Sequence, residues 1–587
     1  MLENSQLLFL KNHRFLVVEI AMQFEFSFLL QRRLILCLGV FVAFFLLPGC
    51  GKRETPVEAG IRTQTLHIVR GSEPQELDPH VVIGQTEHQI IMSLLEGLVT
   101  EDPVDLHPVP GVAERWDISP DLKVYTFHMR ANAKWSNSDP VTAQDFVNSF
   151  KRALSPSMAY QYAYMLYVVK NAEAYNNGAL TNFDEVGFKI IDPHTLQITL
   201  DNPTPYFLSL MCHTSWFPVH LPTIAKYGDP FQRGSQWTRP GRYVGNGSFV
   251  LSDWKVNYKI VVKKSPTYWD AANVKLNEIV FHAIESQDTE ERAFRAGQIH
   301  VGYQLSSAKI DRYKRDHPEQ LHIEPFLANY FYKFNVTKPP LDDKRVRQAL
   351  TIAIDREAIV KDVTRGGQLP AYALTPPNTA GYTPRAQIPR DFNLARKLLA
   401  DAGYPDGKGL PPIEILYNTF EDHKRIAEAI QQMWKKNLGV DARLLNQEWK
   451  VYLASMHSLN YQVARQGWTG DYDDPNTFLD MWVTGGGNNE TGWSNPEYDR
   501  LIKEAAQTLD PAQRLEVFQK AEAILMDELP ILPIYIYTRV YLMEPNVKGC
   551  YPTIIDNHPY KDIWLDKIPA LDTKTVFLDS LNRKDAP

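Results

Sequence analysis

Two tryptophans, one arginine and one aspartate fall within 23 residues of this 587-residue chain: Trp449, Arg465, Trp468 and Asp471. An aspartate can meet the ammonium group of a ligand, because a buried cation without a counter-charge is very costly. An arginine fork can donate two parallel hydrogen bonds to a carboxylate. Aromatic walls supply apolar contact without requiring one particular side chain. Binding of an extended, zwitterionic peptide requires residues of these types.

The backbone between the two charged residues can contribute as well. Gly467 and Thr469 lie between Arg465 and Asp471, and the peptide groups near them can pair with a bound peptide as a neighbouring strand. Spacing alone leaves a structural alternative open, in which the tryptophans are core residues and Arg465 and Asp471 form an ion pair.

Asp471, Asp473 and Asp474 form an acidic cluster, which a secreted hydrolase could use as a pair of catalytic carboxylates. Such clusters are also common in surface loops. The sequence contains no phosphate-binding loop, dinucleotide fingerprint, zinc-protease motif or nucleophile elbow, and its histidines lack metal-ligand spacing. We therefore expect a binding protein rather than an enzyme, with no cofactor and no metal.

Strands and helices are expected throughout the chain. Alternating apolar residues predict strands at 124–129 and 196–200. Thr142 and Asp145 have the spacing of a capping box, which predicts the start of a helix.

Two longer helical patterns lie in the C-terminal half. One covers 345–365 and ends before two glycines. The other carries apolar residues at helical spacing from Ile426 to Met433 and ends near Gly439, with a strand expected at 441–445. This succession predicts α/β units around the charged segment.

Length and composition restrict the class of protein. A chain of 587 residues predicts more than one domain, because single cores stop growing near about 250–300 residues. The net charge of −7 and the absence of a basic block argue against a nucleic-acid partner.

The chain has four cysteines, Cys37, Cys50, Cys212 and Cys550, and none of them forms a CxxC pair. Cys212 and Cys550 could form a disulfide in an oxidising compartment. They could equally be two free thiols, since the sequence gives no distance between them.

The N-terminus reads as an export signal. Two arginines precede an apolar run at 34–47, which is too short for an ordinary membrane span of about 20 residues. We expect a signal peptide over 1–49, with Met22 as a second candidate start. Cys50 resembles the lipid-attachment cysteine of a bacterial lipobox, and residues 50–65 read as a polar tether. A plain signal peptide with a chance cysteine is the alternative.

Several motifs together resemble the oligopeptide-binding proteins, which are peptide receptors of ABC importers within extracellular solute-binding protein family 5. The resemblance covers about residues 65–565 and is strongest from Asn446 to Pro475. It is also carried by SEPQELDP at 72–79, LEGL at 95–98, PGVAERW at 110–116, AKWS at 133–136, PVTAQDF at 140–146, SPTYW at 265–269 and RVRQAL at 345–350.

This resemblance implies a three-lobed α/β periplasmic-binding-protein fold (type II, cluster C-like) that closes around its ligand by a hinge. It places a discontinuous lobe I at 66–95, 222–325 and 540–587, lobe II at 96–221 and lobe III at 326–539. It also implies a monomer that is exported to the periplasm or outer cell surface, binds short peptides, and works with a permease and its ATPase subunits.

The resemblance assigns roles to individual residues. Asp471 matches the partner of the peptide's α-ammonium group, and Arg465 matches the receptor of the C-terminal carboxylate of short peptides. The family residues that form the walls of side-chain pockets correspond to Trp449, Trp468 and Tyr162 here. Two further residues of the family's binding cleft correspond to His423 and Tyr537.

Some positions depart from the family pattern. Met456 stands where close relatives carry a second arginine, and Thr364, followed by Arg365, stands where they carry a lysine used for longer peptides. Ile83 replaces an acidic pocket residue. These departures leave peptide length and side-chain preference open. Murein peptides, dipeptides, nickel and sugars are the alternative solutes within the superfamily.

Overall fold

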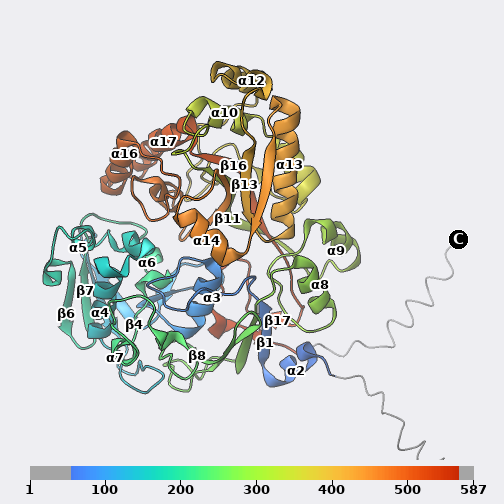
Figure 1. Cartoon of the computed structure of the whole chain (residues 1–587). Helices are drawn as coiled ribbons and strands as arrows, with labels where there is room; N and C mark the ends of the chain where they lie inside the picture. Colours follow the sequence, from blue (N-terminus) through green and yellow to red (C-terminus); the bar gives the residue numbers. More distant parts are fainter. Residues whose placement is uncertain (1–53, 568–587) are drawn as a thin grey trace, which may run out of the picture. The chain divides into compact units, whose positions relative to one another are not determined.

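The computed structural model describes residues 54–567, and the compact unit treated below begins at Pro56. The predicted signal peptide, Met22 and Cys50 lie outside the described residues. Within the described range, no helix combines the length and apolar composition needed to cross a bilayer. Figure 1 follows the chain from blue to red.

The first sheet joins segments that are far apart in the sequence. Its strand order is β1 (Thr65–Val69), β10 (Glu278–His282), β9 (Lys259–Lys264) and β8 (Phe249–Lys255). The pair β1–β10 is parallel, and the other two pairs are antiparallel. The chain thus leaves this sheet after residue 69 and returns to it about 180 residues later.

The second sheet is antiparallel and local. It contains β4 (Ala113–Ile118), β5 (Val124–Met129), β7 (Thr195–Thr199) and β6 (Phe188–Asp192) in that order. The predicted strands at 124–129 and 196–200 are confirmed as β5 and, within one residue, β7. Tyr125, Phe127 and Met129 are buried, as their alternation predicts.

The third sheet is mixed and has six strands. The order is β12 (Leu369–Pro370), β16 (Ile531–Leu542), β11 (Leu321–Phe334), β15 (Val463–Thr469), β13 (Ile413–Asn418) and β14 (Ala442–Gln447). Two small ladders complete the strands: β2 (Val99–Glu101) with β3 (Pro108–Pro110), and β17 (Val547–Lys548) with β18 (Trp564–Leu565).

The α-helices surround these sheets (Figure 1). Their bounds are α2 Pro56–Thr63, α3 Gln85–Leu94, α4 Ala143–Ala153, α5 Ala172–Asn176, α6 Phe207–Leu210, α7 Leu221–Ala225, α8 Gln287–Arg295, α9 Ile310–Asp316, α10 Lys344–Ile352, α11 Arg356–Ala358, α12 Phe392–Asp401, α13 Glu421–Leu438, α14 Trp449–His457, α15 Asn476–Leu479, α16 Pro496–Gln507 and α17 Pro511–Glu528.

Two predicted helix ends are confirmed. Helix α4 begins after Thr142, whose backbone N–H donates to the Asp145 carboxylate at 2.8 Å. Helix α13 is capped by Gly439, which has a φ of 72°. A Cβ atom at this position would lie only 2.3 Å from the carbonyl oxygen of Asp406. Only glycine fits there without strain.

The helical pattern predicted over 345–365 is confirmed apart from an interruption within it. The structure has α10, a break at residues 353–355, then α11 and a π-helical turn, η7 (Ile359–Thr364). Asp355 accepts a hydrogen bond from the backbone N–H of Ala358 at 3.0 Å and so starts a new helix. Arg365 adopts a left-handed conformation directly before the two glycines.

The predicted tether is also shorter than expected, because α2 already starts at Pro56. Its Val57 is buried and donates a backbone hydrogen bond to Gly297 at 2.9 Å. Gly60 packs so closely that a Cβ would lie 2.6 Å from the His300 ring. The polar composition of this segment concealed one buried helical face.

Both cysteines in the described range are free thiols, which answers the question of a disulfide. Cys212 is buried and its thiol donates to the Leu208 carbonyl at 3.4 Å.

The long strands β11 and β16 connect the third sheet to the region of the first. Their central residues pair with each other, Tyr330 opposite Tyr535. A register shift between Pro325 and Asn329 interrupts the ladder. Beyond the shift, Leu321, Ile323, Val540 and Leu542 pack in a small core with Val69 of β1 and with apolar residues of α8 and α9. The lobe division remains a prediction.

Candidate functional site

One cavity of about 270 Å³ lies within the described unit. Its lining includes residues before and at the start of α3, residues of the 3-10 helices η2 (Gln161–Leu166) and η4 (Thr214–Trp216), and residues of α13 and α14. Strands β11, β15 and β16 complete it. All nine side chains and backbone positions predicted as ligand contacts line it: Tyr162, His423, Trp449, Arg465, Gly467, Trp468, Thr469, Asp471 and Tyr537.

Asp471 lies two residues after the end of β15, and its side chain is 11% exposed. In the part of the chain that the structure describes, no lysine or arginine forms an ion pair with it; the nearest basic group is His213 Nε2, 3.7 Å from Oδ1. Burial raises the pKa of Asp471 to about 8, although hydrogen bonds from Thr477 and Tyr162 lower it. The carboxylate is therefore buried without a cation to compensate it.

His213 does not supply that cation. Burial, followed by the neighbouring His88, lowers the pKa of His213 well below its usual value. Its Nδ1 accepts the backbone N–H of Ser215 at 3.2 Å, so the proton of the neutral ring lies on Nε2, toward Asp471. His88 stacks on His213 with ring centroids 4.9 Å apart.

Arg465 supplies the opposite charge at the same cavity. It lies on β15, and its Nη2 donates to the Tyr537 hydroxyl at 2.6 Å while its guanidinium sits 4.8 Å from the Tyr330 ring centroid. It forms no ion pair with a carboxylate among residues 54–567, and its buried Nε has no hydrogen-bond partner. The structural alternative, a direct Arg465–Asp471 ion pair, is absent from this range.

Aromatic side chains form the walls. Trp468 stacks on Tyr162 with centroids 6.2 Å apart, and its indole N–H donates to the Thr477 carbonyl at 2.7 Å, which fixes the ring. Trp449 is the first residue of α14 and stacks on Tyr452 at 5.8 Å. Trp468 and Trp449 are therefore shared between packing and cavity lining.

His423 and the backbone of β15 complete the predicted set. His423 is on α13, 3.4 Å from the Tyr330 hydroxyl, and burial lowers the pKa of its ring well below the usual value. On one side β15 pairs with β11 along its whole length; on the other it pairs with β13 only at Val463 and Ala464. The edge from Arg465 to Thr469 has no strand partner there in the described structure.

Several lining residues were not predicted from the sequence. Lys333 and Glu490 form a buried ion pair of 2.9 Å at the cavity, and Glu490 also contacts His457 at 2.5 Å. Arg539 of β16 and Tyr303 also line it. No local motif marks these residues, because strand register and chain crossings bring them together.

The residues that depart from the family pattern lie in different parts of the structure. Ile83 lines the cavity. Met456 is fully buried in a small core beside Leu416 and Tyr452. Thr364 is buried and its hydroxyl donates to Gln368 at 2.9 Å, while Arg365 is exposed. Met456, Thr364 and Arg365 are not among the cavity-lining residues.

The acidic cluster does not converge on one site. Asp474 accepts two hydrogen bonds from Arg514, at 2.7 and 2.8 Å, and both partners are buried. Asp473 is exposed and accepts the backbone N–H of Ala380 at 3.0 Å. Only Asp471 lines the cavity, so the geometry gives no support to a catalytic carboxylate pair.

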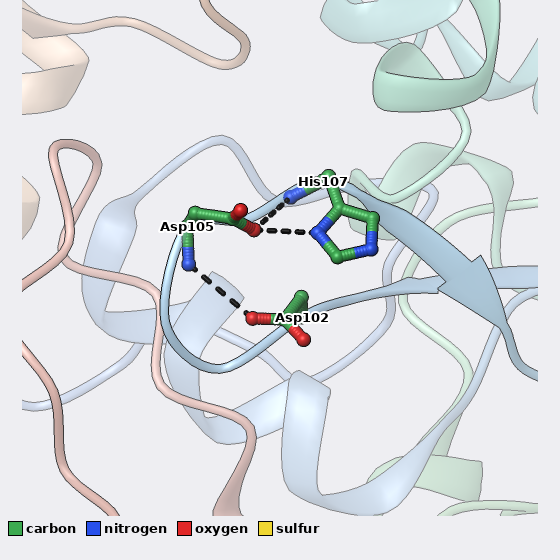
Figure 2. Close-up of side chains that lie close together, drawn as sticks. All are labelled: Asp102, Asp105 and His107. Atoms are coloured by element: carbon green, nitrogen blue, oxygen red, sulfur yellow. Dashed lines mark hydrogen bonds and ion pairs between the residues drawn. The ribbon is translucent and has the colours of Figure 1, made fainter.

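A second polar cluster lies in the turn between β2 and β3. Figure 2 shows Asp102, Asp105 and His107, the one His/carboxylate group of the described chain close enough to share a cation. The Asp105 carboxylate accepts hydrogen bonds from the backbone N–H and from the ring Nδ1–H of His107. The Asp102 carboxylate accepts a hydrogen bond from the backbone N–H of Asp105. The contacts account for the turn, and the cluster lies on the surface.

An α/β fold whose cavity carries an aspartate without a basic ion-pair partner other than a neutral histidine, and an arginine without a carboxylate partner, is typical of a solute-binding protein. A family model described as bacterial extracellular solute-binding proteins, family 5 Middle, matches residues 107–490, and the chain belongs to this family.

Known relatives extend the match. The periplasmic oligopeptide-binding protein OppA of Escherichia coli K12 is 39% identical over 543 residues, covering 89% of this chain and 96% of the relative. The structure of Haemophilus influenzae OppA in complex with RPPGFSPFR matches with a TM-score of 0.80 at 35% identity, covering 86% of this chain and 99% of the other.

The E. coli murein tripeptide-binding protein MppA gives two different scores. One structure matches with a TM-score of 0.82 at 36% identity, covering 86% of this chain and 99% of that one. Its unliganded open form matches with 0.59, covering 86% and 98%. These likenesses confirm the predicted α/β periplasmic-binding-protein fold.

Proposed function

We propose that this chain is an extracytoplasmic receptor that binds short peptides in an extended form and delivers them to an ABC-type importer. One observation carries the proposal: an unpaired buried carboxylate, Asp471, and an arginine without a carboxylate partner, Arg465, line the same cavity. A zwitterionic ligand satisfies both charges at once, which no neutral solute can do. The names of OppA and MppA support the same ligand class.

In this proposal Asp471 holds the peptide's α-ammonium group and Arg465 holds the carboxylate of short peptides. The free edge of β15 near Gly467 and Thr469 pairs with the peptide backbone as an added strand. Trp468, Tyr162 and Trp449, with His423 and Tyr537, surround the side chains. Binding then depends on the main chain and the termini, so many sequences are accepted.

Replacing Asp471 by asparagine tests the ammonium contact. Asp471→Asn keeps the side-chain shape but removes the charge, so the peptide ammonium would be buried without a counter-charge. We expect a loss on the order of 3–5 kcal/mol, which is roughly a hundred- to several-thousand-fold in Kd. Isothermal titration calorimetry with a free tripeptide and its N-acetylated form measures this. Acetylation should weaken binding to the native protein by a similar factor.

Asp473→Asn is the matched control, because Asp473 is two residues away, exposed, and outside the cavity lining. It should bind the free tripeptide like the native protein. Equal affinity of the native protein for free and acetylated peptide would remove Asp471 from its role and the ligand class with it.

We also propose that the mature chain is a monomer held at a membrane by a lipid on Cys50. A signal-like segment followed by a cysteine supports this location. A multi-chain lipid holds firmly, whereas one acyl chain binds marginally. Cys50→Ala should release the protein into the soluble fraction after cell fractionation, and continued membrane retention of this variant would exclude the anchor.

A murein-peptide receptor is the second candidate, favoured by the TM-score of 0.82 to MppA. Both candidates use a peptide ammonium, so Asp471 does not separate them. Mass spectrometry of ligand released from the purified protein by mild denaturation, followed by chiral amino-acid analysis of its hydrolysate, does: D-amino acids would identify murein peptide.

A further inference from the structure

A second arginine lines the cavity without an assigned role. Arg539 lies on β16, is 7% exposed, and contributes to the cavity wall. Its Nε is 3.1 Å from the Asp556 Oδ2 but is a buried donor without a hydrogen-bond partner. Beyond this contact with Asp556, no side-chain hydrogen bond from Arg539 occurs among the described residues, and its guanidinium lies over the rings of Tyr303 and Tyr541. A guanidinium with free donors at a cavity wall is ready to bind an anion.

The charges around Arg539 leave an excess of positive charge. Asp556 is shared, since it also contacts His558 Nε2 at 3.0 Å and accepts a hydrogen bond from Gln89 at 2.9 Å. Burial opposes protonation of His558, but Cys550 and Asp556 raise its pKa to about 10. Arg70 adds a further cation, although its guanidinium donates to the Tyr560 hydroxyl.

The other nearby carboxyl groups are occupied. Glu290 accepts the backbone N–H groups of Tyr303 and Gln304, at 2.7 and 3.1 Å, and burial raises its pKa to about 8. Glu324, the register partner of Arg539 on β11, accepts the Tyr541 hydroxyl at 3.1 Å. Of these carboxylates, only Asp556 forms an ion pair with Arg539, and it shares that contact with His558.

The position of Arg539 relates it to Arg465. Tyr537 and Arg539 are two residues apart on β16, so they share a face of the sheet and lie roughly 7 Å apart. The Tyr537 hydroxyl in turn accepts the hydrogen bond from Arg465. Both arginines thus line the cavity near Tyr537.

We propose that Arg539 is a second carboxylate receptor of the cleft, which selects peptides that present a carboxylate away from Arg465. The carboxylate has two chemical sources: an acidic side chain of a short peptide, or the C-terminus of a longer one. The inference rests on the proposed peptide-binding function.

Calorimetry with two sets of matched peptides tests the inference on the native protein. The first set compares glutamate with glutamine at the second and third positions of an alanine tripeptide. The second compares tetra- and penta-alanine with their C-terminal amides. We expect the acid member of at least one set to bind tenfold or more tighter, which corresponds to about 1.4 kcal/mol. The set that discriminates identifies the source of the carboxylate.

Arg539→Gln should abolish that discrimination and leave the affinity for the neutral member within about threefold. Arg385→Gln is the control, because Arg385 is an exposed arginine paired with Glu516 and lies outside the cavity lining; it should keep the native ratio. If Arg539→Gln does not fold, Arg539→Lys retains the charge without the fork and should reduce the ratio. Melting temperatures report folding.

The outcomes are distinct. A native protein that binds neutral peptides but discriminates in neither set overturns the role of Arg539, as does a native-sized ratio that survives Arg539→Gln or, where that variant does not fold, Arg539→Lys. A native protein that binds no peptide of either set overturns the proposed function, and this inference with it.

Discussion

The role of an acidic residue here depends on its partners and not on its position in the sequence. Asp474 is buried but neutralised by a two-pronged contact with Arg514, so it stabilises the loop after β15. Asp471, three residues earlier, is buried with only a neutral histidine nearby. Ionising this buried carboxyl group in the empty protein lowers its stability, and a ligand ammonium supplies the missing counter-charge.

This environment makes peptide binding dependent on pH. Burial raises the pKa of Asp471 to about 8 in the empty cavity, so much of the empty protein carries a protonated Asp471 at pH 6 to 7.5. An ammonium requires the carboxylate, so binding must release a proton. We expect affinity to rise roughly tenfold from pH 6 to pH 7.5, before the peptide's own amino group titrates near about 7.7–8.0. Calorimetry in buffers of different ionisation enthalpy measures the released proton.

The same shift affects stability with a definite sign. A carboxyl group whose pKa is raised in the folded state contributes fully at low pH, and its contribution is lost as pH rises toward about 8. The empty Asp471→Asn variant should therefore gain thermal stability relative to the native protein as pH rises from 5 to 8. It should also bind peptide without proton release, and release of the same proton by this variant would assign it to another group.

At the scale of elements, local patterns predicted what local interactions determine. Strand β5 and helix α13 with its Gly439 end were both predictable, because alternation and a left-handed glycine are encoded within a few residues. Helix α2 was not, since its polar sequence hides a buried face that only Gly297 and His300 reveal. The break before α11 depends on a single cap, Asp355, inside a continuous helical pattern.

The residues of the candidate site also divide into those that were predictable from the sequence and those that were not. Four site residues were found from the sequence because they lie close together along the chain, on or near α14 and β15: Trp449, Arg465, Trp468 and Asp471. Tyr162, His423 and Tyr537 came only from the resemblance to a family. Lys333 and Arg539 were missed, because β11 and β16 reach the cavity through a register that no spacing rule predicts.

At the scale of the whole molecule, β11 and β16 cross from the third sheet to the core around β1. Their ladder is interrupted between Pro325 and Asn329, beside the cavity. Strand pairs that cross between lobes can bend at such an interruption with small backbone changes. MppA supports this possibility of motion, since its two structures match the chain with TM-scores of 0.82 and 0.59 at nearly equal identity. The structure with the lower TM-score is described as an unliganded open form.

Hinge closure can be measured by small-angle X-ray scattering. Protein freed of co-purified ligand by mild denaturation and refolding should show a smaller radius of gyration when a saturating tripeptide is added, because closure brings together the walls that line the cavity. Asp471→Asn at the same peptide concentration should remain open, since it lacks the charge that holds the ammonium, whereas Asp473→Asn should close. Identical scattering of the native protein with and without peptide, at concentrations where calorimetry shows binding, would contradict a closing trap and indicate a preformed cleft.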